Sequence, residues 1–162
     1  MLTSQRNAVS ALLGAAVLAF TAQPALAQNK AAYAKSAAEF YKASTAFSTA
    51  LADLSKRTAT ASPYDKEMLG RINSQLGYVD ATADGVLALG YVASEMGAPA
   101  DLAAAKKHLL KRCEALKKIS DASGQYVAGL ISNLAAPAII ADANKAKEAN
   151  AALAQQPLCS GK

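Results

Sequence analysis

The sequence is poor in the side chains that carry catalysis or bind metals. Its 162 residues include one histidine, two cysteines and no tryptophan. A structural zinc site needs about four cysteine or histidine ligands, and a di-iron bundle needs paired Glu-x-x-His motifs, so neither site can form. The chain also has no Gly-x-Ser-x-Gly, P-loop or dinucleotide-binding glycine motif. We therefore expect a protein that is not an enzyme and that needs no cofactor or metal.

A haem-binding bundle is the one cofactor alternative, with His108 and a methionine as axial ligands. If the chain folds back near residues 98 and 99, His108 lies level with Leu89. Met96 and Met68 then lie at other levels of the bundle, out of reach of His108. The sequence also lacks a Cys-x-x-Cys-His attachment motif. We interpret His108 as a residue beside a basic helix face.

Aromatic residues are scarce, at 6% of the chain, whereas hydrophobic residues make up 52% and alanine is abundant. Alanine has the highest helix propensity, and apolar residues recur here at the intervals of three and four that mark one side of a helix. No segment has the alternation expected of a strand. We predict an all-α protein, a four-helix antiparallel bundle with one disulfide, with helices at about 29–57, 63–97, 101–134 and 137–155.

The third predicted helix has the longest regular series of apolar and small residues, which we call a seam. Equivalent seams run from Tyr33 to Leu54, from Leu69 to Ala93 and from Ile139 to Leu153. Each seam gives its helix one side that can pack against the others. The tail from residue 156 to 162 is too short and polar to predict another element. The seam of the third helix consists of Leu102, Ala105, Leu109, Cys113, Leu116, Ser120, Ser123, Val127, Leu130 and Leu134.

Four glycines interrupt the second helix at positions 70, 77, 85 and 90. Each costs about 1 kcal/mol relative to alanine in a helix interior. We interpret them as points of close backbone packing, with a hinge or a ligand groove as the alternative.

The first 27 residues have the three parts of a secretory signal peptide. Arg6 lies in a polar opening, an apolar run follows from about residue 8 to 20, and Ala25-Leu26-Ala27 form a small-residue cleavage site. The run is shorter than the roughly 20 residues that cross a bilayer. We predict a periplasmic or secreted protein with no membrane span, whose mature part is a single domain at 28–162. Cleavage removes Arg6, so the net charge falls from +5 to +4.

The two cysteines can form only one intramolecular disulfide. An exported protein reaches an oxidising compartment, which permits this bond. If the third and fourth helices are antiparallel about residues 135 and 136, Cys113 lies level with residue 158, next to Cys159. We predict a Cys113–Cys159 disulfide, which would stabilise the fold by roughly 4 kcal/mol. Free thiols or an intermolecular pair are the alternatives.

Five lysines lie on one arc of the third helix, opposite its seam, and Leu110 and Glu114 interrupt this arc. A solvated helix face explains the pattern without any function. The functional alternative is a docking surface for an acidic protein or an anionic envelope component. The charge excess is too small to predict a nucleic-acid partner. This surface, called the lysine face below, consists of Lys106, Lys107, Lys111, Lys117 and Lys118.

Together these features predict an exported, non-enzymatic binding module, such as an inhibitor, an immunity protein or a chaperone-like protein. The alternative is a periplasmic carrier that holds a small apolar ligand in the bundle core, around Tyr33, Phe40, Phe47 and Tyr78. The seams would fit an intermolecular bundle almost as well as an internal one, so they leave the oligomeric state open.

N-terminal sequencing of the exported protein tests the predicted compartment. Cleavage after Ala27 should leave Gln28 as the first residue, because small residues precede the site. A protein recovered outside the cytoplasm that begins at Met1 would contradict the signal peptide.

Overall fold

The fold is given by a computed structural model, which describes the backbone of residues 4–160 and the side chains of residues 28–160. Five helices follow one another, and no strand occurs within residues 4–160. The predicted all-α class is confirmed. The helices are α1 (Ser4–Arg57), α2 (Pro63–Glu95), α3 (Pro99–Ile131), α4 (Pro137–Leu153) and the single-turn α5 (Pro157–Ser160).

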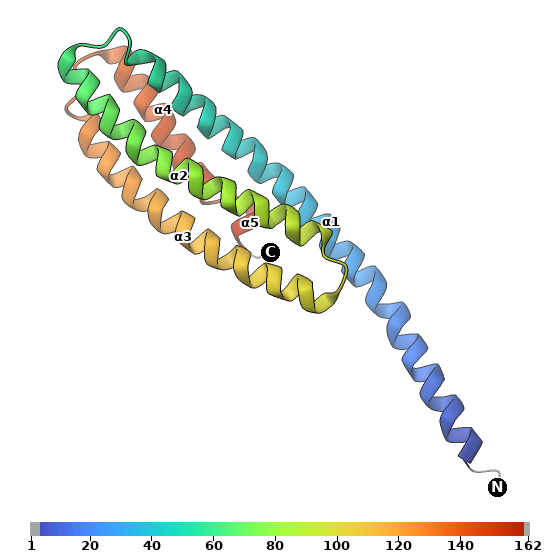
Figure 1. The fold of residues 1–162 in the computed structure, drawn as a ribbon. Helices are drawn as coiled ribbons and strands as arrows, with labels where there is room; N and C mark the ends of the chain where they lie inside the picture. Colours follow the sequence, from blue (N-terminus) through green and yellow to red (C-terminus); the bar gives the residue numbers. More distant parts are fainter. Residues whose placement is uncertain (1–3, 161–162) are drawn as a thin grey trace.

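The four long helices lie side by side as an antiparallel bundle, as predicted (Figure 1). α2 packs between α1 and α3, and α4 closes the bundle by packing on α1 and, less extensively, on α3. The α1–α2 and α3–α4 turns meet at one end of the bundle, and the α2–α3 turn lies at the other. The signal peptide predicted for residues 1–27 falls outside the described side chains, and its cleavage stays a prediction.

The predicted helix ends agree with the structure to within three residues, except at the start of α1. This helix begins at Ser4 instead of residue 29, because the expected start came from the cleavage site and not from a capping residue. Each of the four later helices begins with a proline, whose missing N–H is not needed in a first turn. The Ser62 hydroxyl caps α2 by accepting the Asp65 N–H at 3.1 Å. α3 runs through Gly124 without a break.

The predicted seams form the core. All ten residues of the third predicted seam are buried, nine in α3 and Leu134 just after its end, and so are all eight of α2 from Leu69 to Ala93. In α1 the largest buried side chains are Phe40 and Phe47, both fully inaccessible to solvent. The core therefore consists mainly of leucine, isoleucine, valine and phenylalanine side chains, with fewer alanines and serines among them.

Several buried polar groups are paired across the helices. The Ser120 hydroxyl donates to the Asn150 carbonyl at 3.1 Å, and the Asn150 amide donates to the Ser120 carbonyl at 3.0 Å. The Gln75 amide donates to the Ser123 hydroxyl at 3.1 Å. These bonds fix the α3–α4 and α2–α3 registers, because a shift along either helix would leave a buried polar group unpaired.

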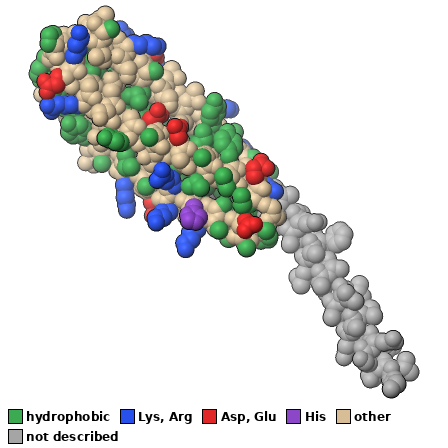
Figure 2. Space-filling view, in the orientation of Figure 1, with side chains coloured by type: hydrophobic (Ala, Val, Ile, Leu, Met, Phe, Trp, Pro, Cys, Tyr) green, Lys and Arg blue, Asp and Glu red, His purple; other side chains and the backbone are tan. Residues whose placement is uncertain are grey.

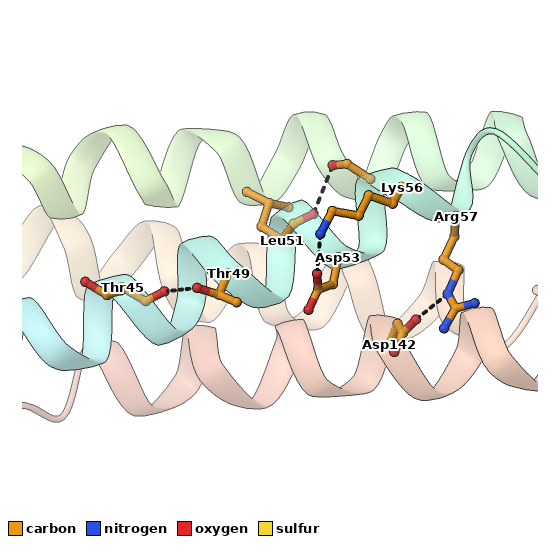
Figure 3. A network of polar contacts seen from close by, with 8 residues as sticks. Thr45, Thr49, Leu51, Asp53, Lys56, Arg57 and Asp142 are labelled. Carbon is orange, nitrogen blue, oxygen red and sulfur yellow. Dashed lines mark hydrogen bonds and ion pairs between the residues drawn. The ribbon is translucent and has the colours of Figure 1, made fainter.

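Polar contacts also fasten the end of the bundle where both turns meet. Figure 3 shows Arg57, at the end of α1, donating to Asp142 of α4 across 2.6 Å. In the same view Lys56 donates to Asp53, and this hydrogen bond lowers the pKa of the Asp53 carboxyl. Asp65 is only 3% exposed, and its carboxylate accepts the Ala135 N–H at 3.0 Å.

The C-terminal tail differs from the prediction. The predicted Cys113–Cys159 disulfide is confirmed and closes a sequence separation of 46 residues. However, the tail forms α5, and Leu158 is 2% exposed in the core. Burying one leucine contributes about 1.5–3 kcal/mol, whereas ordering a chain costs about 1–2 kcal/mol per residue. The leucine alone cannot hold the tail, so the disulfide is what makes its ordered position stable.

Neighbouring side chains lie close to two of the four α2 glycines. A Cβ at Gly85 would lie 2.9 Å from the Arg112 Nε atom, and one at Gly90 would lie 2.8 Å from a Leu158 methyl. Gly70 and Gly77 have nothing within 4 Å of an added Cβ. None of the four glycines therefore marks the close backbone contact that was predicted. At Gly90 the neighbours are buried side chains, at Gly85 the neighbour is the flexible side chain of exposed Arg112, and the interpretation fails at 70 and 77.

The Asp65–Ala135 bond can be tested by substitution. Asp65→Ala should lower the free energy of unfolding by about 1–3 kcal/mol, because the Ala135 N–H loses its acceptor. Asp65→Asn should retain most of the stability, since its side-chain oxygen can still accept. Asp84→Ala on the exposed surface of the same helix is the control and should change stability by less than about 0.5 kcal/mol. Urea unfolding would measure all three, and equal effects of Asp65→Ala and Asp84→Ala would contradict the assignment.

Candidate functional site

All five residues of the lysine face are exposed on α3, as the helix spacing predicted. Lys107, Lys111 and Lys118 are separated by four and seven residues, so they form one column on the side of α3 that points away from the core. None of these three lysines forms an ion pair with another residue in the described range 28–160. Figure 2 shows Lys and Arg side chains gathered around the histidine on this part of the surface.

The other two lysines lie at the side of the face toward α1 and α4. Lys117 is bound to Asp121 at 2.8 Å in an exposed ion pair. Lys106 lines a small cavity together with Tyr33 of α1 and Leu158 of α5. The lysine face therefore has an unpaired column and an edge whose lysines have neighbours, a division that the spacing alone did not predict.

Leu110 and Glu114 interrupt the face in the structure as in the sequence. A shallow depression between Lys106, Lys107 and Lys111 is lined by partly buried Leu110, with Glu114 at its margin. The face thus offers positive charge around a small apolar surface. This combination can attract an acidic partner at long range and then exclude water from a short contact.

His108 is exposed at the edge of the lysine face. In the described part of the chain, no cluster of three or more His, Cys, Asp or Glu side chains could hold a metal ion. Arg112, one turn further along α3, lies against Gly85 of α2. Arg112 was not among the predicted site residues, and its position depends on the missing side chain at residue 85.

The four residues of the carrier alternative do not share one environment. Phe40 and Phe47 are fully buried in the core, whereas Tyr78 is 64% exposed. Tyr33 is partly buried and lines the cavity of about 100 Å³ beside Lys106 and the tail. Burial raises the pKa of the Tyr33 phenol above its ordinary value of 10.0.

A groove between α3 and α4 was not predicted. Small residues form its floor where Ser120, Gly124 and Ala128 follow one another at intervals of four. Its walls carry the Lys117–Asp121 pair, and the buried Asn150 side-chain oxygen beside it has no hydrogen-bond partner. The four-residue interval was visible in the sequence, but it also describes an ordinary helix contact, so it did not indicate a groove.

Exposed tyrosines are the other feature that the sequence reasoning missed. Five of them are between 45% and 64% exposed. Their positions off the seams were the available signal, because a residue outside the seam faces solvent or a partner. They are Tyr41, Tyr64, Tyr78, Tyr91 and Tyr126.

No protein-family model, characterised protein or solved structure matches this chain. Among the helices of the described residues, none has the length and apolar character needed to cross a membrane.

The raised pKa of Tyr33 gives a pH-dependent prediction. The folded protein favours the neutral phenol, so the unfolded chain releases this proton more readily, and the Tyr33 contribution to stability is lost as pH rises through and above 10.0. Urea unfolding between about pH 9 and 11 should therefore show a steeper loss of stability in the wild type than in Tyr33→Phe. Parallel pH profiles would contradict the burial of this phenol.

Proposed function

We propose that the chain is an exported binding module that docks an acidic partner protein through the lysine face. The observation that carries the proposal is the column of Lys107, Lys111 and Lys118, which is exposed and forms no ion pair within residues 28–160. Three ammonium groups on one rigid helix produce a positive field that steers an acidic surface into contact. An inhibitor, an immunity protein or a chaperone-like protein would use such a surface.

The proposed place of action is the periplasm or the extracellular space. The signal peptide pattern supports export, and the disulfide is compatible with an oxidising compartment. A protein partner is favoured over an anionic envelope component, because Leu110 offers an apolar contact amid the lysines that a purely electrostatic surface would not need. The modest net charge of +5 for the whole chain gives no support for a nucleic-acid partner.

A triple charge reversal tests the proposal. The probe is poly-L-glutamate at low salt, and the variant is Lys107→Glu with Lys111→Glu and Lys118→Glu. Binding should weaken at least roughly tenfold, because three attractive contacts become repulsive. Added salt should weaken binding of the wild type, since these charges are exposed and screened.

The control variant carries Lys35→Glu, Lys42→Glu and Lys66→Glu, which make the same charge change on exposed lysines of α1 and α2. It should retain most of the binding. Equal loss in both variants would mean that only net charge matters and would contradict a docking face. Vesicles of anionic phospholipid form a second arm, and binding to vesicles without binding to poly-L-glutamate would contradict a protein partner.

A further inference from the structure

The C-terminal tail fills a notch in the bundle with one side chain. Leu158 of α5 is buried where α2 has Gly90. A Cβ at position 90 would lie 2.8 and 3.1 Å from the two Leu158 methyl groups and 3.4 Å from the Ala37 Cβ of α1. Leu158 therefore occupies the space that a side chain at position 90 would take. The notch is the apolar space that faces Gly90 beside Ala37.

Few polar contacts hold the tail in place. The hydrogen bonds of residues 157–160 in the structure are local, from the Cys159 N–H to the Gln156 carbonyl and from the Ser160 hydroxyl to the Pro157 carbonyl. α5 packs mainly on α1, and its covalent link to α3 is the disulfide from Cys159 to Cys113. Leu158 is the one fully buried side chain of this packing, and the leucine alone does not offset the entropy of ordering the segment.

The space around Leu158 is not completely filled. A cavity of about 100 Å³ lies beside it, lined by Tyr33 and Ser36 of α1, by Lys106 of α3 and by Pro157 of the tail. Removal of Leu158 would join this cavity to the notch. The resulting site would have an apolar floor, a phenol and a hydroxyl on its wall and an ammonium group at its rim.

We propose that the tail is a disulfide-held latch over a binding site for an amphiphilic anion, meaning an apolar group that carries an acid. Opening the Cys113–Cys159 disulfide releases the tail and exposes the notch. The apolar group then replaces Leu158 against Gly90 and beside Ala37, and its acid pairs with Lys106. Lys106 also belongs to the lysine face, but this site does not use the column of Lys107, Lys111 and Lys118 that carries the proposed function.

A dithiol supplies the reducing step. Cys159 is partly exposed whereas Cys113 is 5% exposed, so a thiolate of the dithiol attacks the Cys159 sulfur. The Cys113–Cys159 bond breaks, and Cys113 leaves as a thiolate that takes up a proton. The second thiol then displaces Cys159 and closes the reagent into its own disulfide. Two electrons pass from the dithiol to the protein, which then has two thiols.

The first experiment compares the oxidised protein with the protein reduced by dithiothreitol. In the oxidised form, NMR should show proximity between the Leu158 methyls and both Gly90 and Ala37. In the reduced form these signals should vanish while circular dichroism still reports the helices. Persistence of the Leu158 signals after reduction would overturn the latch. Loss of the helices on reduction would also overturn it, since the disulfide would then support the whole bundle.

The second experiment measures binding of 8-anilinonaphthalene-1-sulfonate, an aromatic sulfonate of the proposed class. Reduction should tighten its binding roughly tenfold or more, because a site that is closed most of the time binds with affinity reduced by its open fraction. Leu158→Ala opens the notch with the disulfide intact, so this oxidised variant should bind the probe as the reduced wild type does. Ser160→Ala, at an exposed tail position, should bind as the oxidised wild type does.

A third variant distinguishes binding of the probe at the notch from nonspecific binding to apolar surface that reduction exposes. Lys106→Gln in the reduced protein should weaken binding of the sulfonate, because it removes the charge at the rim. Lys42→Gln, at an exposed position of α1, should not. Binding that is unaffected by Lys106→Gln, or that stays at the oxidised wild-type level in Leu158→Ala, would overturn the proposed site.

Discussion

Packing of the helices through their seams is the constraint on which the rest of the structure depends. α4, for example, buries Ala143 and Ala146 completely and adds only three other buried residues, Ile139, Asn150 and Leu153. Such a narrow apolar surface stabilises a helix only if its neighbours cover it. Leucine, isoleucine, valine and phenylalanine side chains of the other helices form most of the core that does so. The seam residues Ser120 and Asn150 also bond to each other's backbone between α3 and α4, so the core and these hydrogen bonds depend on the same alignment of the helices.

Much of the fold could be predicted because its determinants are local. A three-and-four spacing such as that of Leu109, Cys113 and Leu116 identifies the buried side of a helix whatever packs against it. Prolines at helix starts fix the boundaries in the same local way. The disulfide required one further assumption, the position of the α3–α4 turn, and Pro137 indicates that position. The spacing of the apolar residues and the positions of the turns were therefore enough to predict both the helical bundle and the disulfide.

The tail could not be predicted, because its structure depends on distant residues. A single leucine in a short polar segment has no periodicity, and its burial needs the absent side chain of Gly90 on another helix. Arg112 is a similar case, since its guanidinium occupies space left by Gly85. The sequence predicted close backbone packing at these glycines, but not which side chain fills each space. Gly70 and Gly77 lie in the same helix, and neither has an atom within 4 Å of an added Cβ.

The candidate site was predicted as one arc of five lysines. In the structure these lysines form an unpaired column and an edge whose lysines have neighbours. The spacing placed all five lysines on the exposed side of α3, which needs only helix geometry. It could not separate the unpaired column from Lys106, whose neighbours come from α1 and α5. Likewise, the aromatic carrier site assumed that Tyr78 faces inward, but Tyr78 lies off the α2 seam and is exposed. These assignments depend on contacts between helices, and the periodicity of one helix carries no information about such contacts.

The central claim, that α3 presents a docking face to a protein partner, can be tested most directly by photo-cross-linking in the exporting cell. A photoreactive residue at position 114 lies within the lysine face, and one at exposed Ala46 of α1 lies on a different helix. We expect position 114 to give one discrete adduct with an acidic protein and Ala46 to give none. Absence of an adduct at position 114, or the same adduct at both positions, would contradict the proposed docking face.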